Sequence, residues 1–183
     1  MIKISKRDID FSPEIYTLGQ CIYITTDKFW DGGYSNDASL TEKCEFYKLA
    51  SIFSKTLREI ITILNDKVII SESCCQTGRY FEKWKDKSNY ESYKTLKHFI
   101  KKCCLLEFPS DNIIIDYIIE NNFRYLSCID IYLEFNQVVF QPTCHSEIIM
   151  YIGDEKKYSD IKDSVEEIIN MNQLILKQDR IIL

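Results

Sequence analysis

Histidine and cysteine are the residues of this chain that could support catalysis. There are only two histidines, His98 and His145, but eight cysteines, and Cys144 directly precedes His145. A cysteine nucleophile activated by an imidazole is therefore conceivable, and folding could bring Cys74 or Cys75 near either histidine. Adjacent residues on an extended loop point apart, however, and no glycine-rich turn that could form an oxyanion hole adjoins a cysteine. A cysteine-nucleophile enzyme is thus the alternative hypothesis, and the favoured interpretation is that the chain has no catalytic residues.

Metal and cofactor sites are not expected. Cys103, Cys104, Cys144 and His145 are suitable zinc ligands by type, but structural zinc sites pair ligands that lie two to four residues apart, not adjacent ones. Phosphate-binding loops and dinucleotide fingerprints need several closely spaced glycines, and the whole chain has five. We therefore expect no metal ion and no cofactor.

The cysteines are expected to be reduced thiols in a cytoplasmic protein. Two pairs are vicinal, Cys74–Cys75 and Cys103–Cys104, and neighbouring cysteines rarely bridge each other without distorting the backbone. The first ten residues are mixed polar and charged, unlike a secretory signal. No run of about 18 apolar residues is present, so no membrane-spanning segment is expected.

Charge is distributed unevenly along the sequence, although the net charge is only −5. Residues 79–106 carry eight basic and three acidic residues, a net +5, and residues 107–183 carry six basic and fourteen acidic residues, a net −8. In residues 79–102 the basic side chains are interleaved with aromatic ones, a composition that nucleic-acid binders use. The rest of the chain would repel a polyanion, so nucleic acid is not the expected partner, and a nucleic-acid-binding accessory protein is a further alternative.

The acidic C-terminal part could instead present a negative surface to a basic partner protein. The acidic residues expected to contribute are Asp154, Glu155, Asp160, Asp163, Glu166 and Glu167, with Asp130 and Glu134 if their strand face is open. Several of these lie at the start of an expected helix, where complementing the helix dipole is the ordinary explanation for acidic residues. Trp30 and Tyr34, in a polar loop, are candidate aromatic anchors, although Trp30 could equally fold back on the core.

Four helices and several strands are expected to position these residues. Ser39 and Glu42 have capping-box spacing, and apolar residues then recur at three- and four-residue steps to Leu64, which predicts a long amphipathic helix. A second helix is predicted from Ser110 or Asp111 to Asn121, and a third from Ser159, with residues 94–104 also helical in pattern. Strands are predicted at residues 15–26, 67–71, 124–135, 138–141 and 147–152, with an edge strand in 174–183.

The order of these elements favours an α+β fold. Strands and helices do not alternate strictly, and the three strands around residues 124–152 are close enough in sequence to form an antiparallel meander, with Asn136 and Gln137 as a two-residue turn. The length suits one domain over residues 1–183, in which an antiparallel sheet packs against several α-helices.

Small size, acidity, reduced thiols, an α+β pattern and the lack of catalytic signatures together give a profile that resembles bacterial toxin-immunity proteins. The resemblance concerns this general profile, because no motif identifies a particular immunity family. It implies a non-enzymatic inhibitor that binds a cognate toxin, often a basic nuclease, and covers its active surface with carboxylates that stand in for phosphates. The oligomeric state is not predicted.

Overall fold

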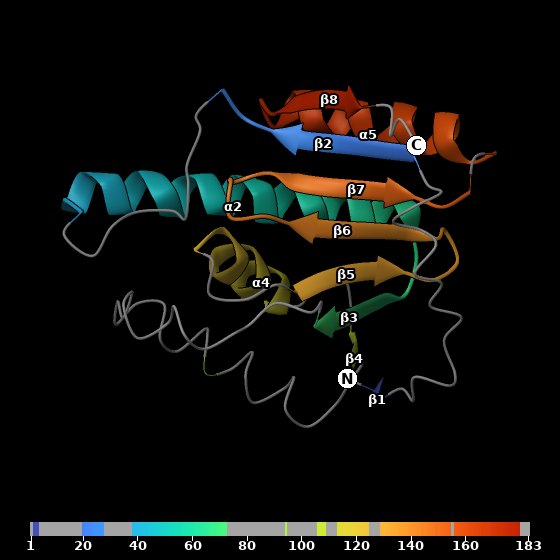
Figure 1. Cartoon of the computed structure of the whole chain (residues 1–183), viewed down its shortest axis with the longest axis horizontal. Helices are drawn as coiled ribbons and strands as arrows, with labels where there is room; N and C mark the ends of the chain where they lie inside the picture. The colour runs from blue at the N-terminus through green and yellow to red at the C-terminus, as the bar shows by residue number, and fades with distance from the viewer. Residues whose placement is uncertain are drawn as a thin grey trace.

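The fold is organised around a long helix, α2, that lies across one face of an antiparallel sheet (Figure 1). The computed structural model describes residues 2–3, 20–27, 38–72, 94, 106–108, 113–124, 129–154 and 156–179. The described helices are α2 (Leu40–Leu64), α4 (Ile114–Phe123) and α5 (Tyr158–Met171). The described strands are β1 (Ile2–Lys3), β2 (Gln20–Thr25), β3 (Val68–Glu72), β4 (Leu106–Phe108), β5 (Ile129–Leu133), β6 (Val138–Pro142), β7 (Ile148–Ile152) and β8 (Ile175–Asp179).

All described strands belong to one sheet with the order β1-β4-β3-β5-β6-β7-β2-β8, and every neighbouring pair is antiparallel. The strands β5, β6 and β7 follow one another in sequence and in space, which confirms the predicted meander and the α+β class. The strand β8 pairs with β2 at one edge, as expected for residues 174–183.

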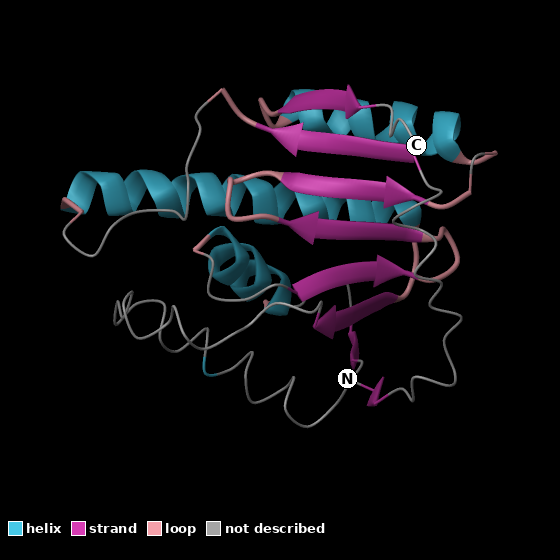
Figure 2. Ribbon diagram, in the orientation of Figure 1, coloured by secondary structure: helices cyan, strands magenta, loops and turns pink. Residues whose placement is uncertain are grey.

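The helices α2, α4 and α5 cover the same face of the sheet (Figure 2). Alternate residues of each strand point to this face, so that in β7 Ile148, Met150 and Ile152 are buried while Ile149 and Tyr151 lie on the other face. The buried strand residues that point to this face form one apolar core with the inner faces of the three helices. No helix of the described residues is long and apolar enough to cross a membrane.

The predicted capping box of α2 is present. The Ser39 backbone N–H donates to Glu42 Oε2 at 2.7 Å, and the Glu42 N–H donates to Ser39 Oγ at 3.2 Å. These two bonds satisfy backbone donors that have no partner within the helix. The helix ends at Asn65, whose left-handed backbone (φ 46°) is a common helix terminator.

Other predicted boundaries are wrong. The helix α4 follows Ile113, without a side-chain cap, and therefore begins after Ser110 and Asp111. Ser159 does not cap α5 but lies inside its first turn, because Asp154 shapes the chain before the helix: its carboxylate accepts the Lys156 N–H at 3.0 Å and its carbonyl the Lys157 N–H at 3.1 Å. Most of the predicted helix 94–104 lies outside the described residues, of which Lys94 is helical.

The helices α2 and α4 are joined by apolar and polar contacts. The rings of Phe53 and Phe123 meet edge to face with their centroids 5.0 Å apart, and both side chains are fully buried. Beside them Arg58 of α2 forms an ion pair with Asp116 of α4. Burial and, to a lesser degree, the nearby Asp116 carboxylate raise the pKa of Glu120, one turn further along α4, to about 7.

We expect Phe53→Ala to destabilise the fold by about 3–5 kcal/mol, because it removes a buried ring and leaves a cavity between α2 and α4. The free energy of unfolding, measured with urea, tests this. Ile63→Ala is the matched control: Ile63 lies on the same helix but is 55% exposed, so its loss should change stability by less than about 0.5 kcal/mol. A similar effect of the two substitutions would contradict the described packing.

We also expect the stability of the protein to fall as the pH rises from about 4.5 to about 7 on account of Glu120. In this window the folded state holds the Glu120 proton and the unfolded state, in which the pKa has its ordinary value of 4.5, releases it. Glu120→Gln should therefore stabilise the protein more at pH 8 than at pH 4.5. Urea unfolding of both proteins at the two pH values measures this difference, and an equal effect at both would contradict it.

Candidate functional site

Four predicted site residues share the solvent-exposed side of α5. Asp160, Asp163, Glu166 and Glu167 are all exposed, and their spacing places them opposite the buried residues of the same helix. We call these four residues the acidic face. Within the described part of the chain, no ion pair or hydrogen bond engages any of the four carboxylates. The helix carries one basic residue, Lys162, so its net charge is −3.

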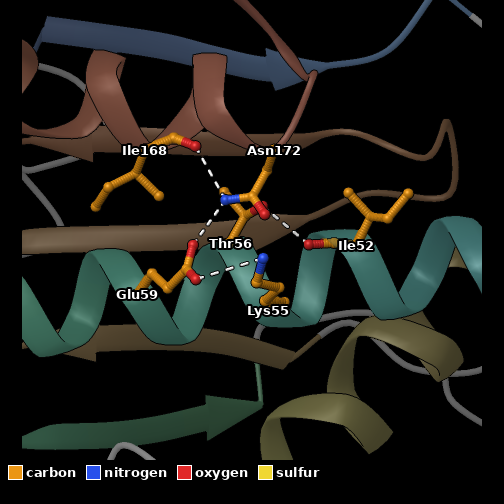
Figure 3. A network of polar contacts seen from close by, with 6 residues as sticks. All are labelled: Ile52, Lys55, Thr56, Glu59, Ile168 and Asn172. Atoms are coloured by element: carbon orange, nitrogen blue, oxygen red, sulfur yellow. Dashed lines mark hydrogen bonds and ion pairs between the residues drawn. The ribbon is translucent and has the colours of Figure 1, made fainter.

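The inner side of α5 explains why the acidic face points outward. Ile161, Val165, Ile168 and Ile169 are buried in the core, as their spacing predicted. Asn172, after the last turn, donates from Nδ2 to Glu59 Oε2 of α2 at 2.6 Å and to the Ile168 carbonyl at 3.0 Å (Figure 3). Glu59 is also paired with Lys55, at 3.7 Å. The end of α5 is thus attached to α2, which fixes the rotation of α5 about its axis.

The helix dipole accounts for only one of the four acidic residues. Asp160 is the acidic residue of the first turn, where a negative charge is favourable. The effect of the dipole is confined to the terminal turns, and Glu166 and Glu167 lie in the second half of this helix of 14 residues. Asp163 lies three and four residues before them, at spacings where like charges repel. The like charges of the acidic face therefore repel one another, and no ion pair with a described residue offsets this repulsion.

Glu134 and Asp154 lie on two loops that are held together at one end of the sheet. Glu134 begins the turn between β5 and β6, which comprises residues 134–137 and not only the predicted Asn136 and Gln137. Asp154 follows β7, and the N–H of its neighbour Gly153 donates to the Gln137 carbonyl at 2.9 Å. Both acidic side chains are half-buried, and both loops lie at the end of the sheet at which α5 begins (Figure 1).

Asp130 does not belong to this surface. It lies in β5 on the sheet face away from the helices, but it is only 2% exposed, so the open strand face on which its inclusion depended is not present. Gln141 of β6 donates from Nε2 to Asp130 Oδ1 at 3.3 Å, and the Tyr151 hydroxyl of β7 donates to Gln141 Oε1 at 3.4 Å. Burial, followed by the nearby Cys21 and Asp130, raises the pKa of Tyr151. Asp130 is the buried member of a row of polar side chains across the sheet, in which Gln141 and Tyr151 are half-buried.

Three predicted site residues, Trp30, Tyr34 and Glu155, lie outside the described residues, as does the basic stretch 79–102 apart from the exposed Lys94. The described cysteines are Cys21, which is buried, Cys44, which is exposed, and Cys144, which is half-buried. The described ranges contain no group of three or more His, Cys, Asp or Glu side chains that could hold a metal ion. His98 and the remaining cysteines are not described, so the alternative of a cysteine-nucleophile enzyme stays a prediction.

Sequence reasoning did not identify Phe135 and Asp66, which lie at the same end of the sheet as Glu134. Phe135 is 62% exposed, and the Asp66 carboxylate accepts the backbone N–H groups of Phe135 and Asn136, at 3.2 and 2.7 Å. The signal available in the sequence was that Phe135 is an apolar residue at the end of a predicted strand, next to a predicted turn. The contact with Asp66 joins residues 69 and 70 positions apart and has no local signature.

Comparison with known proteins adds no assignment to this geometry. No protein-family model matches the chain, no curated protein matches it in sequence, and no solved structure matches its fold.

Proposed function

We propose that this protein is a non-enzymatic inhibitor that binds a basic partner protein through the acidic face of α5. The observation that carries the proposal is the set of four exposed carboxylates that form no ion pair with a described residue. A partner with a cationic surface would supply such pairs. Asp154 and Glu134, on loops at the same end of the sheet as the start of α5, would extend this surface.

The energetics of α5 support an interaction role for these residues. Each pair of like charges three or four residues apart destabilises a helix by roughly 0.2–0.5 kcal/mol. Asp163 with Glu166 and Asp163 with Glu167 are two such pairs. This repulsion lowers the stability of the free protein and would be relieved when a basic partner binds. It is consistent with a binding site, because uncompensated features of a fold gather at functional positions.

The expected mode of action is that of a toxin-immunity protein. Carboxylates spaced along a helix can occupy the cationic groove with which a nuclease holds the phosphates of its substrate, and so exclude the substrate without any covalent step. Complementary charge would also speed the encounter of the two proteins, and this effect weakens as salt screens the charges.

The first test compares two double charge reversals that change the net charge by the same amount. Glu166→Lys with Glu167→Lys alters the acidic face, and Asp27→Lys with Glu45→Lys alters exposed acidic residues elsewhere. The wild-type protein is used as bait in cells that naturally contain it, and the captured protein is purified and titrated with each variant by calorimetry. We expect the first variant to bind at least tenfold more weakly and the second to bind like the wild type.

If both variants are folded by circular dichroism and both bind as tightly as the wild type, the acidic face takes no part in the mechanism. If both variants lost affinity equally, net charge and not the acidic face would be responsible, which would also contradict the proposal.

The second test separates stability from binding. Glu166→Gln with Glu167→Gln removes the repulsion with Asp163 and should raise the free energy of unfolding in urea at low salt by about 0.5 kcal/mol. The same variant should bind the purified partner more weakly. A variant that is less stable than the wild type, or that binds equally well, would show that these carboxylates serve the fold and not an interface.

A further inference from the structure

We propose that Phe135 is the apolar anchor of this binding surface, inserting into an apolar pocket that cationic side chains border on the partner. The inference rests on the proposed function and extends it from the charge of the partner to the shape of its site. Phe135 lies in the turn between β5 and β6, and this turn is at the end of the sheet at which α5 begins (Figure 1).

The exposure of Phe135 is unusual for its position. Turns between strands favour Gly, Asn, Asp and other polar residues, whereas this turn presents a phenyl ring that is 62% exposed. Among the described residues the other large hydrophobic side chains with comparable exposure are all aliphatic. Aromatic side chains dominate the affinity of protein interfaces because they bury a large area with few rotatable bonds.

Hydrogen bonds from a distant part of the chain hold the backbone of Phe135. Asp66, just after α2, accepts the N–H of Phe135 at 3.2 Å and of Asn136 at 2.7 Å. The Asn136 side chain donates to the Leu64 carbonyl at 2.9 Å and to Asp66 Oδ2 at 3.0 Å. The turn is thus fastened to the end of the helix that organises the core, so the ring is presented from a fixed position.

Gln137, two residues after Phe135 in the same turn, has a strained backbone. Gln137 has a φ of 51°, which is uncommon for a residue with a side chain. Its carbonyl accepts the Gly153 N–H at 2.9 Å, so the loop after β7 holds it in place. Strained backbone that is held by its surroundings is characteristic of preorganised binding sites, where fewer degrees of freedom are lost on association.

Two lysines contact Phe135, and one of them links its backbone to the start of α5. Lys157, immediately before α5, donates from Nζ to the Phe135 carbonyl at 2.9 Å, three residues before Asp160. Lys67 Nζ lies 5.7 Å from the centroid of the Phe135 ring. Phe135 is therefore held close to the start of α5, the end of the helix at which Asp160 lies, and the turn that carries it also carries Glu134.

The charge of this surface favours a different protein as the partner over a second copy of the chain. A symmetric dimer through Phe135 would place two α5 helices, each with a net charge of −3, close to the same interface. Like charges across an interface are unfavourable. A basic protein with an apolar pocket satisfies both the ring and the carboxylates.

The test uses the purified protein that the wild-type bait captures, titrated by calorimetry with Phe135→Ala and with Leu40→Ala. Leu40 is a matched control because it is 79% exposed and lies at the opposite end of α2 from Asp66. We expect Phe135→Ala to weaken binding at least tenfold and Leu40→Ala to leave it unchanged, with both variants as thermally stable as the wild type to within a few degrees.

The outcomes separate this inference from the proposed function. Loss of affinity on reversing Glu166 and Glu167, with Phe135→Ala binding like the wild type, would overturn the anchor and leave the acidic face in place. Loss in Phe135→Ala alone would support the anchor and contradict the acidic face. A wild-type protein that is dimeric by light scattering and becomes monomeric in Phe135→Ala would assign the ring to self-association and overturn the inference, as would the absence of any captured partner.

Discussion

The burial of one face of α2 against the sheet is the constraint on which the rest of the described structure depends. Phe46, Phe53, Leu57 and Ile60 are inaccessible to solvent, and the same helix provides the surface on which α4 and α5 pack. Removing this much apolar area from water is the main favourable term in folding. The helix also ends with a left-handed residue, Asn65, which directs the following Asp66 toward the turn between β5 and β6.

In this arrangement the outer side of α5 takes no part in the packing of the described core. The inner side of α5 is committed to the core, and Asn172 attaches its end to α2, so its outer side can carry four carboxylates without disturbing the packing (Figure 3). The turn that bears Phe135 is held by hydrogen bonds to its backbone, while its ring is 62% exposed with Lys67 Nζ 5.7 Å from the centroid. Exposed charge and an exposed aromatic ring are thus both carried by elements fixed to the core, and this combination is what the proposed inhibitor requires.

Local patterns predicted the elements well where neighbouring residues decide the structure. The pair Ser39 and Glu42 forms the expected capping box, and the spacing of Ile161, Val165 and Ile168 identifies the buried side of α5. Prediction failed at boundaries that depend on backbone hydrogen bonds to side chains. Asp154 accepts the N–H of Lys156 before α5, and the helix begins at Tyr158, so Ser159 is not its cap. The turn between β5 and β6 is centred on Phe135 and Asn136, whose N–H groups bind the Asp66 carboxylate 69 and 70 residues away.

Periodicities of a few residues are sufficient to predict the fold class, the amphipathic helices, the antiparallel meander and the position of four carboxylates on one side of α5. The burial of Asp130 and the exposure of the acidic face depend on how the elements pack, since both faces of β5 carry residues that pack. The tertiary structure also brings Asp66 to Phe135, at a separation of 69 residues. Such contacts form only when chain folding closes long loops, and no local pattern records which groups then meet.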